Sequence, residues 1–123
     1  MEKPKFEFYT RPSGHTEFQE YFDKLNPADQ RKLAAVIFKT EQYGLQIAAR
    51  QRWIRKLQDG IFELRTTGSD IQRGLYFHDE GSRFIVTHGF TKKDGKTPPA
   101  EIRHAQALRR EYYDEKGGTT HGE

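Results

Sequence analysis

The sequence predicts an α+β fold in which an N-terminal strand and helix hairpin precede a small antiparallel sheet and a C-terminal helix. Two observations lead to this prediction. Three strand-like runs lie in the second half of the chain, at residues 61–66, 71–78 and 83–90. Apolar residues recur three and four positions apart in the first half and near the C-terminus, which is the period of a helix. The 123 residues suffice for one domain, which we expect to span residues 1–115.

The first half of the chain is predicted to hold one strand and two helices. Residues 5–9 alternate in the manner of a strand before Pro12 and Gly14 break the chain. A second helix is expected over residues 28–43, because the segment is rich in helix formers and Gly44 suits its C-terminal end. The first helix ends at Asn26-Pro27, and its apolar face is formed by Phe18, Tyr21, Phe22 and Leu25.

The segments that connect the predicted elements in the second half of the chain differ in type. Residues 45–53 are compatible with a short helix or with the approach to a strand. Residues 79–82 read as a tight hairpin loop between two antiparallel strands. Pro98-Pro99 opens a helix over residues 100–113, and we expect residues 116–123 to form a disordered tail.

The composition predicts a cytoplasmic protein without a membrane partner. The chain has no cysteine, so no disulfide is expected. It also lacks an apolar stretch long enough to cross a membrane and a hydrophobic signal at its N-terminus.

The net charge of +3 is small, but the basic residues are grouped. This grouping indicates one cationic surface able to meet phosphates, and the alternative is that each group is a solvated helix face. The three groups are Arg50, Arg52, Arg55 and Lys56; Lys92, Lys93 and Lys96; and Arg103, Arg109 and Arg110.

One strand combines apolar and charged residues on a single face. Ile61, Glu63 and Arg65 share that face because strand side chains repeat every second residue. Arg73 lies on the neighbouring strand, and Lys92 follows the third, so these side chains can converge at one part of the sheet. The alternative is a cross-strand ion pair between Glu63 and an arginine, which contributes little if it is exposed.

The residue types in this set suit cleavage of an RNA backbone. Such a reaction needs a base for the 2′-hydroxyl proton, cations for the charge on the phosphoryl oxygens and a proton donor for the leaving oxygen. A carboxylate, arginines and lysines supply these groups without a metal ion. No histidine has the spacing of a metal ligand, so we expect no metal site and no cofactor.

An ordered combination of motifs lies in residues 53–113. It consists of Lys56-Leu57, the strand from Gly60 to Arg65, Arg73 with Tyr76-Phe77, the segment from His88 to Lys93, Thr97-Pro98 and the helix that begins near Glu101-Ile102. In these residues the chain resembles the phage-derived, HigB-like branch of the RelE/ParE toxin superfamily. This resemblance implies a RelE/ParE-like fold and a toxin of a type II toxin–antitoxin system: a metal-independent, ribosome-dependent mRNA endoribonuclease that inhibits translation through 2′-hydroxyl attack.

The resemblance also suggests catalytic roles. Glu63 is the candidate base, Arg65 and Arg73 are the candidates for stabilising transition-state charge, and Lys92 or Lys93 is a phosphate anchor or proton donor. Replacing either arginine by alanine is expected to abolish cleavage while leaving the fold intact. The best-studied RelE enzymes carry lysines on the strand where Ile61 and Glu63 stand here.

Further residues are assigned by charge and position. His88 is a candidate acid or base, and the alternative is a hydrogen-bonded structural histidine. The candidate RNA-binding residues are Arg50, Arg52, Arg55, Lys56 and Lys96.

The expected partners follow from the same resemblance. They are a cognate helix-turn-helix antitoxin, the ribosome and mRNA, with operator DNA contacted only through the antitoxin. Two other functions remain open: a ParE-like, non-enzymatic inhibitor of DNA gyrase, and a non-toxic corepressor that binds the antitoxin.

Overall fold

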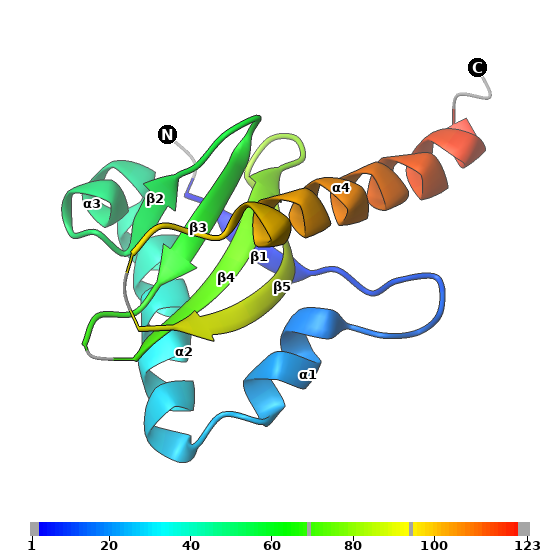
Figure 1. The fold of residues 1–123 in the computed structure, drawn as a ribbon. Helices are drawn as coiled ribbons and strands as arrows, with labels where there is room; N and C mark the ends of the chain where they lie inside the picture. Colours follow the sequence, from blue (N-terminus) through cyan, green and yellow to red (C-terminus); the bar gives the residue numbers. More distant parts are fainter. Residues whose placement is uncertain (1–2, 69, 94, 121–123) are drawn as a thin grey trace.

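The computed structural model describes residues 3–68, 70–93 and 95–120, and it confirms the predicted α+β class (Figure 1). The elements are β1 (Lys5–Phe8), α1 (Glu17–Asp23), α2 (Pro27–Tyr43), α3 (Leu45–Arg50), β2 (Ile54–Lys56), β3 (Ile61–Arg65), β4 (Ile71–His78), β5 (Arg83–Lys92) and α4 (Pro99–Thr120).

The strands form one five-stranded sheet in the order β1-β5-β4-β3-β2. The pairs β2–β3, β3–β4 and β4–β5 are antiparallel, as predicted for this half of the chain. The N-terminal strand β1 joins the sheet in parallel beside β5, so the complete sheet is mixed. A bulge interrupts the β4–β5 register between Leu75 and Tyr76, where the Thr87 hydroxyl donates a hydrogen bond to the Leu75 carbonyl (3.2 Å).

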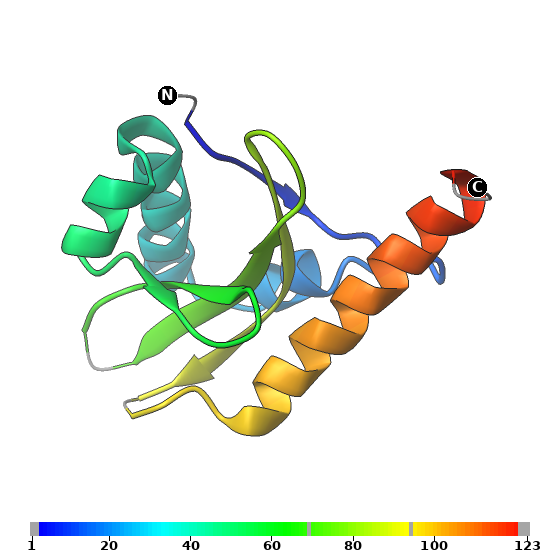
Figure 2. The same ribbon diagram turned by 90° about the horizontal axis from the view of Figure 1, so that it is seen from above.

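Helices cover both faces of the sheet. Figure 2 shows α2 and α3 on one side and α4 on the other. The core beneath α1 and α2 contains Phe18 and Leu33 from the helices and Leu64, Tyr76 and Val86 from the strands. Beneath α4, the second core contains Ile61, Leu75, Phe77 and Ile85 from the sheet and Ile102, Ala105 and Leu108 from the helix.

The segment that the sequence left open contains both alternatives in succession. Helix α3 runs from Leu45 to Arg50, and strand β2 follows after a short turn. Gly44 separates α2 from α3 with a φ of 92°, a conformation that glycine adopts readily. The helix α3 therefore folds back beside α2 and delivers β2 to the edge of the sheet.

Helix α4 continues to Thr120, beyond the predicted helix end at residue 113. Lys116 and Tyr112 on α4 both contact the carboxylate of Asp79 in the β4–β5 turn, at 3.1 and 2.9 Å. These contacts hold the distal part of the helix against the sheet. Residues 121–123 lie outside the described residues. Although α4 has 22 residues, no helix in the described part of the chain is long and apolar enough to cross a membrane.

Gly89 on β5 provides a test of this packing. A β-carbon at this position would lie 2.2 Å from Cδ2 of Tyr21 on α1 and 2.9 Å from the Arg73 carbonyl oxygen. We expect Gly89→Ala to lower the free energy of unfolding by about 3 kcal/mol, because neither the ring nor the backbone has room to move. Urea denaturation measures this loss.

Gly14→Ala is the matched control, since nothing lies within 4 Å of the added methyl group and only the left-handed backbone at φ 95° opposes it. That strain costs about 1 kcal/mol. Equal losses for the two variants would contradict the close approach of α1 to β5.

Candidate functional site

The centre of the site is the carboxylate of Glu63 on β3, whose side chain has no exposed surface. Its Oε2 lies 3.3 Å from Nη1 of Arg73 and accepts a hydrogen bond from the Thr97 hydroxyl. Its Oε1 lies 3.2 Å from Nη2 of Arg55 and 4.0 Å from Nε of Arg65. We call these five residues the Glu63 cluster.

The strand register explains why these residues meet. Arg55 on β2 pairs directly with Glu63 on β3, and Arg65 on β3 pairs directly with Arg73 on β4. Residues two apart on β3 share a face, so the carboxylate lies between the arginines of both neighbouring strands. Ile61 is on the same face and packs beneath α4, which places the cluster beside that core.

The Glu63 cluster has a buried floor and an exposed rim. Arg73 has no exposed side-chain surface, and its Nη2 donates a hydrogen bond to the Gly95 carbonyl (3.4 Å). The side chains of Arg55 and Arg65 are 36% and 21% exposed. Only the rim arginines can therefore contact a bound molecule directly. Replacing Arg73 would disturb the fold as well as the site, contrary to the expectation from the sequence.

The arginines influence one another electrostatically. Burial lowers the pKa of the Arg65 guanidinium, and the positive charge of Arg55 adds to this effect. The negative charge of Glu63 raises the pKa of Arg65, whereas the positive charges of Arg73 and Arg52 lower it further. Three guanidinium groups thus surround one carboxylate, a surplus of two positive charges. Such a surplus favours an anion at the rim.

Some polar atoms of the cluster have no hydrogen-bond partner among the described residues. They are Nε of Arg55, Oε1 of Glu63 and Nε of Arg73. Oε1 of Glu63 is held by the charge of Arg55 at 3.2 Å rather than by an aligned hydrogen bond. Buried groups of this kind are costly to keep unpaired and concentrate at functional sites.

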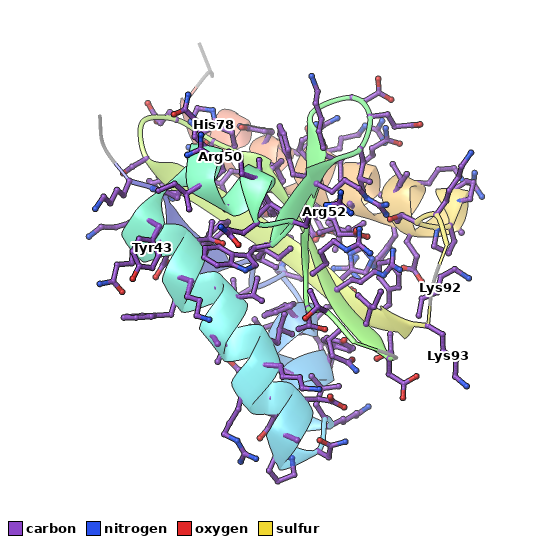
Figure 3. The ribbon with its side chains drawn as sticks, turned by 90° about the vertical axis from the view of Figure 1, so that its left-hand side faces the viewer. Tyr43, Arg50, Arg52, His78, Lys92 and Lys93 are labelled. Carbon is purple, nitrogen blue, oxygen red and sulfur yellow. The ribbon has the colours of Figure 1, made fainter. Side chains whose placement is uncertain are left out.

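The lysines after β5 lie at the margin of the site. Lys92 ends β5 and pairs with Ile71, and its Cε is 3.8 Å from where a β-carbon on Gly95 would be. Lys93 and Lys96 are exposed. Figure 3 shows Lys92 and Lys93 projecting from the end of β5, with Arg52 nearer the centre of the same view.

Two predicted RNA-binding residues lie away from the cluster. Lys56 is on the opposite face of β2 from Arg55 and lines an apolar cavity of about 300 Å³ with Phe62 and Tyr76. Arg50, at the end of α3, is distant from Lys92 and Lys93 in Figure 3. The sequence grouped these side chains by proximity along the chain, whereas the strand and the turn direct them to different surfaces.

His88 is buried on β5 and hydrogen-bonded through both ring nitrogens. Its Nδ1 lies 3.0 Å from the Thr87 hydroxyl, and its Nε2 lies 2.9 Å from Oε1 of Glu101. Burial lowers the pKa of His88, Glu101 opposes this shift, and the charge of His104 adds to it. These contacts fit the structural interpretation of His88, with the ring held between β5 and α4.

Thr97 is the member of the cluster that sequence reasoning missed. Its hydroxyl donates to Glu63 and accepts from Nη2 of Arg55 at 3.3 Å, so it ties the loop after β5 to the arginines. The sequence marked Thr97 as part of the family resemblance and as a residue preceding a helix, but gave it no role in the site. Among the described residues, no group of three histidines, cysteines or acids is placed to hold a metal ion.

The charge of Glu63 is expected to hold this arrangement together. Glu63→Gln keeps the shape but leaves Arg73 buried without a counter-ion, which should lower the free energy of unfolding by about 3 kcal/mol. Urea denaturation of the variant measures the change. Glu80→Gln is the control, because that carboxylate is 77% exposed and its loss should change stability by less than about 0.5 kcal/mol. Similar free energies of unfolding for the two variants would show that the charge of Glu63 is not needed to keep Arg73 buried.

The pKa of His88 predicts a pH dependence of stability. Because its folded-state pKa lies below the ordinary value of 6.5, the unfolded state binds more protons as the pH falls below 6.5. The stability that His88 contributes to the folded state is therefore complete above pH 6.5 and decreases below it. The negative charges of Glu101 and Glu17 oppose the lowering of the His88 pKa but do not cancel it. Urea midpoints between pH 5 and 8 should show this slope, and His88→Gln should flatten it.

Comparison with known families places most of the chain in one of them. Residues 20–110 match the model of the family described as phage derived protein Gp49-like (DUF891). This range includes all the strands except β1, and it contains the whole Glu63 cluster. No curated protein matches the sequence.

Proposed function

The chain belongs to the phage-derived Gp49-like family, and on that premise we propose that it is a toxin that cleaves translated mRNA on the ribosome. The family is associated with toxins of the RelE and HigB type from toxin–antitoxin systems. The observation that carries the proposal is the Glu63 cluster, in which arginines outnumber the single carboxylate and two of them reach the surface.

The rim arginines are placed to stabilise charge on a phosphate. In cleavage by 2′-hydroxyl attack, the 2′-oxygen bonds to phosphorus while its proton passes to a solvent water, negative charge grows on the phosphoryl oxygens, and the bond to the 5′-oxygen then breaks. Arg55 and Arg65 present forked donors that match two oxygens of one phosphate, and the Glu63 carboxylate fixes their orientation from below. Lys92 at the margin is the proposed donor of the proton to the leaving oxygen.

The buried position of Glu63 changes its proposed role. A general base has to touch the hydroxyl group whose proton it takes, and Glu63 has no exposed surface. We assign Glu63 and Arg73 to positioning instead, because they hold the rim arginines in place without reaching the RNA. Arg55, first considered for non-specific RNA contacts, takes the place of Arg73 beside Arg65 at the reacting phosphate.

The proposed partners are an antitoxin, the ribosome and its mRNA. An antitoxin of the helix-turn-helix type would neutralise the toxin, and operator DNA would be reached through it. A cationic rim also suits approach to the negatively charged ribosome, because long-range attraction raises the rate of association.

Loss of Arg65 should remove cleavage. With purified ribosomes translating a defined mRNA, the wild-type protein is expected to produce codon-phased 5′ ends in primer extension and cyclic phosphates on the upstream fragments. Arg65→Ala should reduce the rate by about 10²- to 10³-fold, because one preorganised donor to the phosphate is lost.

Arg110→Ala provides the comparison, since this exposed arginine lies on α4 outside the Glu63 cluster. It should cleave at the wild-type rate, and circular dichroism should confirm that both variants are folded. Normal cleavage by Arg65→Ala would exclude the rim as the site. Breaks in DNA instead of RNA would indicate gyrase inhibition, and an absence of both would leave a partner of the antitoxin without toxicity.

A further inference from the structure

A basic groove, separate from the Glu63 cluster, lies on the opposite side of the sheet from α4. It has a volume of about 210 Å³, and the described lining contains two lysines and no acidic side chain. The lining residues are Lys32, Ala35, Val36, Lys39, Trp53, Thr66 and Thr67. The lysines come from α2, Trp53 directly precedes β2, and Thr66 and Thr67 directly follow β3.

The two lysines are placed over the groove at different points. Nζ of Lys39 lies 5.7 Å from the centre of the Trp53 ring, and Tyr43 packs against that ring at 6.3 Å. Nζ of Lys32 reaches the β3–β4 loop, 3.9 Å from where a β-carbon on Gly68 would be. The lysines are seven positions apart on α2, which corresponds to about 10 Å along the helix, so each can meet a separate anionic group.

The groove is connected to the Glu63 cluster through the backbone. The Trp53 carbonyl accepts a hydrogen bond from the Arg65 amide (2.8 Å). Thr66 directly follows Arg65 at the end of β3, where successive side chains point to opposite faces, and Trp53 directly follows Arg52 in the turn before β2. Arg52 lies between α2 and the end of β5 that carries Lys92 and Lys93 (Figure 3). One flexible polyanion crossing Arg52 can therefore touch both surfaces.

We propose that this groove binds the single-stranded RNA that flanks the reacting phosphate. Lys32 and Lys39 contact phosphates, the Trp53 ring packs against a ribose or base, and Thr67 offers a hydroxyl for hydrogen bonding. An aromatic ring between cations is the usual composition of a surface that tracks a single strand. The identity of the ligand rests on the proposed function, whereas the groove can be tested without cleavage.

Trp53 is the only tryptophan of the chain, so its emission reports directly on the groove. A 2′-O-methyl RNA oligonucleotide cannot undergo 2′-hydroxyl attack and serves as the probe. Titrating it into the full-length protein should change Trp53 emission with saturation, and the anisotropy of a fluorescein-labelled copy should give the same affinity.

Lys32→Gln and Lys39→Gln should each weaken binding several-fold. Each should also reduce the slope of log affinity against log salt by about 0.7, as expected when one phosphate contact to a single strand is lost. Lys5→Gln is the matched control, because this exposed lysine lies on β1 at the other edge of the sheet. It should bind with wild-type affinity and slope.

The outcomes separate the groove from the catalytic proposal. Arg65→Ala should lose cleavage yet keep the Trp53 response. A wild-type protein that shows the Trp53 response but never cleaves would overturn the proposed function and support the groove. Unchanged Trp53 emission together with wild-type affinity of Lys39→Gln would overturn the groove, whatever the cleavage result. Equal affinity for duplex RNA would overturn the assignment to a single strand.

Discussion

The ion pair between Glu63 and Arg73 joins β3 to β4 at a position where neither side chain reaches solvent. Burying two charges is unfavourable unless they remain close and hydrogen-bonded, and here the Thr97 hydroxyl and the Gly95 carbonyl supply the additional bonds. The requirement to satisfy this pair therefore fixes the loop after β5. It also fixes Arg55 and Arg65, which surround the same carboxylate at the surface.

Because the counter-ion is buried and the cations extend outward, the cluster is asymmetric. A surface ion pair would neutralise itself in water, and its contribution would be small. Here the negative charge is held below the rim, and the guanidinium groups of Arg55 and Arg65 are partly exposed to solvent. A binding partner with phosphates then completes the charge balance. The same geometry that stabilises the sheet thus creates the attraction for an anion.

The sequence predicted the elements better than it predicted the site. The strand and helix periods located most of the sheet and α2, since burial imposes a regular spacing on apolar residues. The site depends on register, which follows from pairing between strands rather than from local pattern. Without β2, which follows the segment left open and was not predicted as a strand, the pairing of Arg55 with Glu63 was not visible. The burial of Glu63 could not be predicted from the sequence either, because glutamate side chains are exposed in most proteins.

The turn that leads into β2 shows how local strain and the basic surface are combined. Helix α3 ends in a Schellman motif: the Trp53 amide bonds the Ala48 carbonyl at 2.9 Å, and the Arg52 amide bonds the Ala49 carbonyl at 3.1 Å. The left-handed position of this motif usually holds glycine, but here Arg52 occupies it with a φ of 64°. An L-residue in that conformation costs about 1 kcal/mol. Strain of this kind persists where the side chain has a use. In Figure 3 Arg52 lies between α2 and the end of β5, so a cation with a left-handed backbone stands between the two proposed RNA contacts in that view.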